Sequence, residues 1–403
     1  MEICIATNSI NGKGGLCCFR KYITVAILFM CILDVSAQTE LPKPMLWNVD
    51  NIDRIKVDPR CKKTLKKIIK ISDVYCESKP IVVTDKIKSF VEDTHYYCSI
   101  GGYWWQDSLN PKEYVHKDGE RNPMTKDYDA SRLSEFSKRC SYLSVAYYIT
   151  DEKKYFDSFI DQLDSWFINE TSFMYPNFEY AAVIIGKNEN KGRASGMIQA
   201  YSFIDVIESI LLVNAKTTID TTMINTIQRW FVDFTDWAES GRFGYSLRKS
   251  NNNTGLAYDV MLTEFYLFVR KEEEARKLYD SFLEKRLLAQ IDEEGKQVAE
   301  LKRTKAFSYS LFNLSHILDF CFIAQYWNPD YYQEHQERID KAYDFLQSFE
   351  NNQEEFPYQQ KTDWEECKKR LNSQLQRRER LRGNVVDLFE NAKHPVSLNV
   401  VLN

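Results

Sequence analysis

The sequence predicts an all-α protein whose antiparallel helix hairpins close into an incomplete α/α toroid, a form of barrel. Apolar residues recur at intervals of three and four along most of the 403 residues, whereas the alternation typical of strands is scarce. Only 10 prolines and 14 glycines interrupt the chain, which favours long helices. Beyond the first hairpin, we expect helices at about 197–213, 219–239, 257–270, 272–289, 307–327 and 335–349.

The first 37 residues predict an export signal. The basic pair Arg20-Lys21 precedes the apolar run 23–33, and residues 35–37 form the small-x-small pattern that signal peptidase accepts. The run is too short for a permanent membrane anchor. A lipoprotein signal ending at Cys31 is the less favoured alternative, because apolar sequence continues beyond it. We therefore expect an exported protein, periplasmic or secreted, with no integral membrane span after the signal is removed.

The remaining chain divides into three parts. We expect residues 38–79 to form lead-in helices, 80–350 the toroid, and 351–403 a final helix and tail whose many charges predict a solvated surface. The first toroid hairpin turns at Thr150-Asp151. Its two apolar faces are Leu133, Phe136, Cys140, Leu143 and Tyr147, followed by Tyr155, Phe156, Phe159, Ile160, Leu163, Trp166 and Phe167.

Composition and charge restrict the partners. Aromatic residues make up 14% of the chain, a surplus compatible with carbohydrate binding, although a core filled with rings is the simpler explanation. The formal net charge is −5 and no basic stripe is present, so nucleic acid is not an expected partner. No zinc-ligand spacing occurs. The cysteines of the exported chain look mostly like buried apolar residues, with a Cys61–Cys76 disulfide left open.

Two long irregular stretches are expected to carry function. The first covers about 94–128 and contains the aromatic run Tyr103-Trp104-Trp105, and the second covers about 175–193. A long loop inside a compact domain is usually functional or disordered, and tryptophans argue against disorder. Because both stretches join helices, we expect them to lie over the same mouth of the toroid.

Five motifs in a fixed order resemble the alginate lyase domain family. They are His95 followed by Gly102-Tyr-Trp-Trp105, then Lys117-Asp-Gly-x-x-Asn-Pro123, Pro176-Asn-Phe-x-Tyr180, Asn252-Asn-x-Gly-x-x-Tyr-Asp-Val260, and Glu300-Leu-x-Arg-Thr-x-x-x-x-Tyr-Ser-Leu-Phe-Asn-Leu314. The resemblance covers roughly residues 80–350. It implies an exported polysaccharide lyase with an α/α-toroid fold, no metal or other cofactor, and an anionic uronate polymer, alginate or a related glucuronan, as partner.

The resemblance also implies a set of catalytic residues. In β-elimination the C5 proton of a uronate leaves from beside a carboxylate whose charge must be neutralised. Asn252, Asn253 and Arg303 match the family positions for that neutralisation, and Tyr309 matches the catalytic tyrosine. A tyrosine near Arg303 is expected to have a lowered pKa and to act as base, acid or both. The proposed substrate-binding residues are His95, Tyr103, Trp104, Trp105, Lys117, Asn177, Tyr180, Arg193 and Tyr258.

One position departs from the family pattern. The family has Asn-Asn-His-Gly where this chain has Asn252-Asn253-Thr254-Gly255, and threonine is not a base near neutral pH. Three interpretations follow. Tyr309 performs both proton transfers, another histidine such as His95 or His116 takes over, or the protein is a catalytically impaired lyase that binds polysaccharide in the periplasm.

Simpler structural roles compete with each assignment. The asparagines are good N-caps for the helix that follows, Arg303 is placed to pair with Glu300, and Tyr309 shares a helix face with core residues. A third function class is a glycoside hydrolase, which needs two placed carboxylates. Asp107, Asp118 and Asp259 are available for that role, but no motif favours them.

Overall fold

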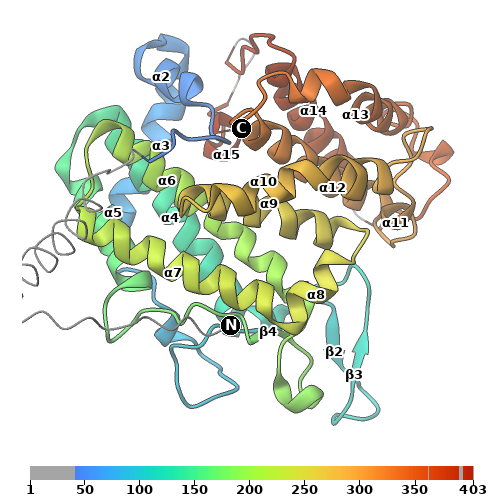
Figure 1. Ribbon diagram of the computed structural model, residues 1–403, viewed down its shortest axis with the longest axis horizontal. Coiled ribbons are helices and arrows are strands. Elements are labelled where there is room, and N and C mark those ends of the chain that lie inside the picture. The colour runs from blue at the N-terminus through green and yellow to red at the C-terminus, as the bar shows by residue number, and fades with distance from the viewer. Residues whose placement is uncertain (1–40, 362, 390–393, 403) are drawn as a thin grey trace, which may run out of the picture. The chain divides into compact units, whose positions relative to one another are not determined.

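A computed structural model describes residues 41–361, 363–389 and 394–402. The predicted signal peptide, residues 1–37, lies outside the described residues. Residues from Pro42 onward form one compact unit, and the all-α prediction is confirmed (Figure 1).

Two described helical stretches, Asn188–Lys216 and Ala306–Ala324, are long and apolar enough to cross a membrane. Both are core segments, with 72% and 83% of their apolar windows buried inside the protein.

Helices account for most of the described chain, and they follow one another in hairpins. The first are α2 (Val49–Val57), α3 (Lys62–Cys76), α4 (Asp129–Thr150), α5 (Lys153–Phe167), α6 (Ser202–Lys216), α7 (Thr221–Ser240) and α8 (Arg242–Arg248). The later ones are α9 (Asn253–Phe268), α10 (Glu272–Phe282), α11 (Val298–Leu301), α12 (Ala306–Ala324), α13 (Tyr331–Gln347), α14 (Trp364–Leu381) and α15 (Leu398–Leu402). A π-helical segment, Leu283–Leu288, extends α10.

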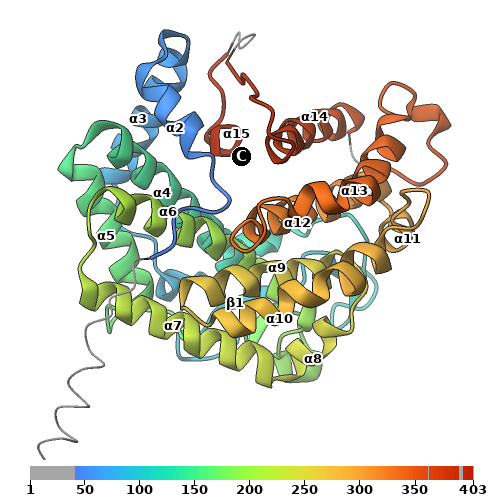
Figure 2. The same ribbon diagram turned by 45° about the horizontal axis from the view of Figure 1, so that its top comes forward.

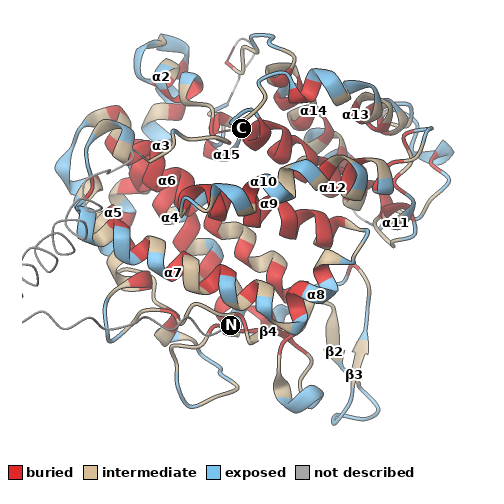
Figure 3. Cartoon of the chain, viewed as in Figure 1, coloured by how far each residue is buried: buried red, intermediate tan, exposed pale blue. Residues whose placement is uncertain are grey.

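The hairpins form an inner and an outer layer. Helices α4, α6, α9, α12 and α14 pack successively against one another, and α5, α7, α10 and α13 lie outside them. The inner helices are more buried than the outer ones. Helices α9 and α12 are buried along nearly their whole length, whereas the outer helices expose one face (Figure 3). This arrangement is the incomplete α/α toroid that the sequence predicted.

Helix α14 corrects one expectation. The helix forms where the sequence places it, but it packs on α12 instead of standing solvated. Its buried face includes Trp364 and Leu371, and Arg377 reaches Asp319 of α12 at 2.7 Å. Because the buried Arg377 is paired with a carboxylate, the charged helix α14 can take a place in the inner layer.

The two ends of the described chain meet beside the inner layer. The Asn48 amide donates to the Leu402 carbonyl at 2.7 Å, α15 packs on α2, and α2 packs on α4 (Figure 2). The amides of residues 45–47 donate to the Glu208 carboxylate, which is fully buried in α6. One side chain thus satisfies three backbone N–H groups that water cannot reach.

Short strands occupy the two stretches expected to be irregular. β1 (Cys98–Ile100) pairs in parallel with β4 (Tyr180–Val183), and β2 (Trp104–Gln106) pairs antiparallel with β3 (Tyr114–His116). The β1–β4 pairing joins the first stretch to the second, as expected for two loops over one mouth. All six described cysteines are free thiols, so the Cys61–Cys76 disulfide does not form.

The buried carboxylates of α6 predict how stability depends on pH. Burial raises the pKa of Glu208 from 4.5 to about 7 and that of Asp205 from 3.8 to about 6. Between the ordinary and the raised pKa of each carboxyl group, the folded state binds more protons than the unfolded state. The free energy of unfolding should therefore fall as the pH rises from about 4.5 to 7. Glu208→Gln should make that slope shallower in urea denaturation measured across this range. An unchanged slope would contradict the assignment.

Candidate active site

Asn252 closes the N-terminus of α9 and shapes the loop before it. Its Oδ1 accepts the backbone amide of Thr254 at 3.1 Å and the Thr254 hydroxyl at 2.6 Å, together with the Ser250 hydroxyl at 2.8 Å. The N-cap interpretation is therefore correct for this oxygen. The Asn252 Nδ2 makes no hydrogen bond within the described chain, so its two protons remain available to a ligand.

Asn253 is held by Glu300. Its backbone amide donates to Glu300 Oε1 at 2.8 Å and its Nδ2 donates to Oε2 at 2.5 Å. Both residues are buried, at 3% and 1% exposure. Burial raises the pKa of Glu300, although the two hydrogen bonds from Asn253 oppose the shift. Glu300 thus fixes Asn253 and is not the ion-pair partner of Arg303 that the sequence suggested.

Arg303 pairs instead with Asp118, from the loop after β3. The Arg303 Nη2 lies 2.7 Å from Asp118 Oδ1, and Asp118 Oδ2 accepts the Thr304 amide at 3.2 Å and the Thr304 hydroxyl at 2.9 Å. Burial alone would raise the pKa of Asp118, but these hydrogen bonds hold it well below its usual value. The ion pair fixes the guanidinium at the start of α12.

Tyr309 lies between the arginine and the first irregular stretch. The Arg303 guanidinium carbon is 3.8 Å from the centre of the Tyr309 ring, and the Tyr309 hydroxyl donates to the Tyr103 hydroxyl at 2.9 Å. Tyr309, Phe312 and Ser315 are the only residues of α12 that are not buried, which places them on one open stripe.

The expected lowering of the Tyr309 pKa is wrong. Burial raises this pKa well above its ordinary value, the hydrogen bond to Tyr103 raises it further, and the attraction of Arg303 is too small to reverse the shift. The resting site therefore holds a protonated phenol. A protonated phenol has a proton to donate, and it has no basic site for accepting one.

A buried ion pair supports the asparagine loop from behind. The Arg286 Nε lies 2.7 Å from Asp259 Oδ2, and the Arg286 guanidinium also donates to the carbonyls of Leu247 and Ser250. Any side chain at Gly255 would place a Cβ 2.2 Å from the Ser250 carbonyl oxygen. The motif residues Gly255 and Asp259 are thus explained by the close packing of this loop.

Aromatic and cationic side chains of the two irregular stretches lie together, and we call this group the rim: Trp104, Trp105, Lys117, Lys187 and Arg193. Trp104 on β2 lies near two cations, with Lys187 Nζ at 5.5 Å and the Arg193 guanidinium carbon at 5.6 Å from the ring centre. Lys117 Nζ lies 5.1 Å from the Trp105 ring. Flat rings flanked by cations are what an anionic sugar polymer requires.

The rim depends on a close approach at one glycine. A Cβ at Gly101 would lie 2.7 Å from the Trp104 ring and 2.8 Å from the Arg193 guanidinium. Arg193 is anchored there because its Nε donates to the Ala182 carbonyl at 2.9 Å.

A second aromatic cluster holds the remaining loop candidates. The His95 Nδ1 is 2.6 Å from the Phe173 carbonyl oxygen, and its ring packs against Tyr175. Tyr180 packs edge-on against Tyr96, and Asn177 Oδ1 accepts the Glu179 amide at 3.2 Å, an internal turn contact. No hydrogen bond or ring contact among the described residues joins His95, Asn177 or Tyr180 directly to Tyr309.

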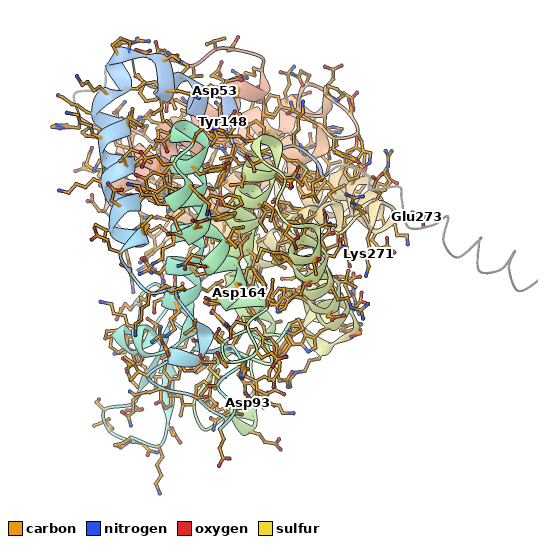
Figure 4. All side chains as sticks on the ribbon, turned by 90° about the vertical axis from the view of Figure 1, so that its left-hand side faces the viewer. Asp53, Asp93, Tyr148, Asp164, Lys271 and Glu273 are labelled. Atoms are coloured by element: carbon orange, nitrogen blue, oxygen red, sulfur yellow. The ribbon has the colours of Figure 1, made fainter. Side chains whose placement is uncertain are left out.

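Figure 4 locates this cluster within the fold. Asp93 accepts the His95 amide at 3.0 Å, and it lies at the opposite end of the helical body from Asp53 and Tyr148 (Figure 4). The strands β2, β3 and β4 lie at the same end as this cluster (Figure 1).

Tyr258 is not a binding residue. It is 2% exposed, and its hydroxyl donates to the Ala238 carbonyl at 3.2 Å inside the core. The proposal that it contacts substrate is therefore corrected: it lies on the part of α9 that is buried on all sides, which leaves it no route to a sugar.

Sequence reasoning missed several members of the site. Asp118 was considered only as a hydrolase carboxylate, although its Lys-Asp-Gly motif pointed to this loop. Glu300 was assigned to the wrong partner. Lys187 and Lys305 carry no motif signal, yet Lys187 joins the rim and the Lys305 side chain lies against the loop at Gly119.

These residues form a cluster of amides, a guanidinium, a phenol and aromatic rings on an α/α toroid, and comparisons with known proteins identify the family. The alginate lyase family model matches residues 84–356, so the chain belongs to the alginate lyase family. None of the curated proteins compared with the chain matches it.

Solved structures agree with that membership. An alginate lyase from Bacteroides ovatus is similar over 85% of this chain and 93% of its own, with 32% identity and a TM-score of 0.80. Two variants of alginate lyase A1-III complexed with a tetrasaccharide share the fold at 14% identity. Their TM-scores are 0.55, over 91% of this chain and 95% of that one, and 0.51, over 79% and 81%.

The Asp118 network predicts a measurable loss of stability. Asp118→Ala leaves the half-buried Arg303 unpaired and removes the acceptor of the Thr304 amide, so we expect a loss of about 2 kcal/mol. The matched control is Asp107→Ala in the same stretch, whose carboxylate accepts one amide, that of Leu109 at 2.8 Å. That variant should stay within about 0.5 kcal/mol of the parent. Equal urea midpoints for the two variants would contradict the assigned role of Asp118.

Proposed function

We propose that this protein is a polysaccharide lyase that cleaves a uronate polymer, alginate or a related glucuronan, by β-elimination. The observation that carries the proposal is a series of contacts: Asn253 donates to the Glu300 carboxylate, the Arg303 backbone amide donates to the Glu300 carbonyl at 3.0 Å, and the Arg303 guanidinium lies over the Tyr309 ring. Amide donors, a guanidinium and a phenol lie together at one mouth of the toroid, beside a rim of rings and cations. The Bacteroides ovatus relative is described as an alginate lyase, which supports the same substrate class.

In this proposal the substrate carboxylate is neutralised by Arg303 and the Asn252 side-chain amide, because the Asn253 side-chain amide is buried and already donates to Glu300. Asp118 occupies the Nε and Nη2 edge of the guanidinium, so Arg303 contributes an oriented donor more than a free charge. The Asn252 Nδ2 is the uncommitted amide, and Asn253 is held in place by Glu300. Stabilising negative charge that develops on the carboxylate is the step that makes the C5 proton removable.

Tyr309 is the proton donor to the departing O4. Its raised pKa keeps the phenol protonated, and Tyr309 lies on the one stripe of α12 that is not buried. The hydrogen bond to Tyr103 orients that hydroxyl before substrate arrives. Donation to O4 completes the cleavage of the C4–O4 bond and avoids an alkoxide leaving group.

Removing the phenol hydroxyl should abolish elimination without abolishing binding. For Tyr309→Phe we expect product formation to fall by about 100-fold or more, the range of general acid catalysis. Ultraviolet absorbance of the new C4–C5 double bond measures the product, and polymer retardation of the protein measures binding. Phe312→Leu, on the same stripe but without a proton to give, is the matched control. Near-parental activity in Tyr309→Phe would refute the assigned role.

A second candidate function is binding of anionic polysaccharide without cleavage. Thr254 favours it, because the side chain at the family's histidine position carries no base, and its hydroxyl donates to Asn252 Oδ1 at 2.6 Å. The rim of Trp104, Lys187 and Arg193 would serve a binding protein equally well.

Export remains a proposal that rests on the N-terminal sequence. If the signal peptide is removed after Ala37, the mature protein begins at Gln38. Mass spectrometry of the protein recovered outside the cytoplasm should find that N-terminus. Recovery of the full-length chain from the cytoplasm would contradict export.

A further inference from the structure

β-Elimination also needs a group that accepts the C5 proton, and most groups beside Tyr309 are committed elsewhere. Asp118 is ion-paired, and its lowered pKa makes it a poor base. Glu300 is 1% exposed and is occupied by two hydrogen bonds from an asparagine. Thr254 and the amides before it have no basic group near neutral pH. The protonated Tyr309 phenol cannot accept a proton before it has lost its own.

His116 lies beside this cluster. It ends β3 directly opposite Trp104 on β2, and opposed residues of antiparallel strands project from the same face. The centroids of the His116 and Trp104 rings are 5.3 Å apart, and the His116 and Tyr103 rings are 6.2 Å apart. Tyr103 is the residue that receives the Tyr309 hydrogen bond. A sugar stacked on Trp104 would therefore have an exposed imidazole at its edge.

The other histidines are placed differently. His95 is bound to the Phe173 carbonyl in the second aromatic cluster. Three more lie on α12, on α13 and near α15, without a hydrogen bond or ring contact to Tyr103 or Tyr309 within the described residues: His316, His335 and His394. Among the described histidines, only His116 has a ring contact to Tyr103 or Trp104, whereas the buried His316 ring contacts Phe312 and Tyr201.

We propose that His116 is the catalytic base, supplied by the β2–β3 hairpin in place of a histidine at position 254. The inference rests on the proposed lyase function. An imidazole nitrogen takes the C5 proton, and the C5–H electron pair forms the C4–C5 double bond as the C4–O4 bond breaks. O4 receives the Tyr309 proton. The imidazolium then releases a proton to water and the tyrosinate takes one up, so protons balance over one turnover.

The test is loss and chemical rescue. His116→Ala should lower product formation by about 100-fold or more, the usual contribution of a general base, while polymer binding persists. Because position 116 is exposed, added imidazole can reach the vacated space and should restore part of the rate. The control is His394→Ala, an exposed histidine near the C-terminus, which should keep the parental rate and show no response to imidazole. A second variant, Thr254→His combined with His116→Ala, should also regain activity, because Thr254 is the one residue of α9 that is not buried.

Each outcome is decisive. Parental activity in His116→Ala overturns the inference and leaves the proposed function standing, because the roles proposed for Arg303 and Tyr309 do not involve His116. Loss of activity that neither imidazole nor Thr254→His restores overturns it as well, because the role of His116 is then structural. If the parent protein gives no unsaturated product from any uronate polymer, both the proposed function and the inference fall.

Discussion

The ion pair between Asp118 and Arg303 is the interaction on which the site depends. It joins the loop after β3 to the start of α12, two segments 185 residues apart in the sequence. Through it the guanidinium stacks on Tyr309, and the same loop region brings Tyr103 to the phenol. The pairing has an electrostatic consequence: the net charge at the centre is near zero, so attraction of an anionic polymer falls to the rim cations Lys117, Lys187 and Arg193.

The helical frame supplies the remaining polarity. Helices α9 and α12 both begin at this mouth, and helix N-termini carry partial positive charge that favours a carboxylate. The Asn252 Oδ1 accepts backbone amides at the N-terminus of α9, and its Nδ2 makes no hydrogen bond within the described chain. Behind it, the Arg286–Asp259 pair and the close packing at Gly255 hold the loop in a single arrangement. A weakly charged but oriented set of donors is suited to stabilising a transition state more than a resting anion.

The fold could be predicted from sequence because its signal is local. The spacing of Leu133, Phe136 and Cys140 is set by the helical period, and such spacing needs no knowledge of distant partners. The grouping of Arg303, Tyr309 and Trp104 came from the family resemblance. The expectations that were wrong concern properties set by three-dimensional neighbours. Burial outweighs Arg303 in setting the Tyr309 pKa, and the charged face of α14 is buried because its arginines form ion pairs with neighbouring helices. Whether Tyr258 faces a sugar or the core is equally invisible in a linear motif.

The central claim is elimination at a site built around Tyr309. The most direct measurement is the structure of the products, by mass spectrometry and NMR, after the parent protein acts on alginate, polymannuronate, polyguluronate and glucuronan. We expect oligosaccharides with a C4–C5 double bond at the new non-reducing end. Saturated products from hydrolysis, or intact polymer that is bound but never cleaved, would contradict it.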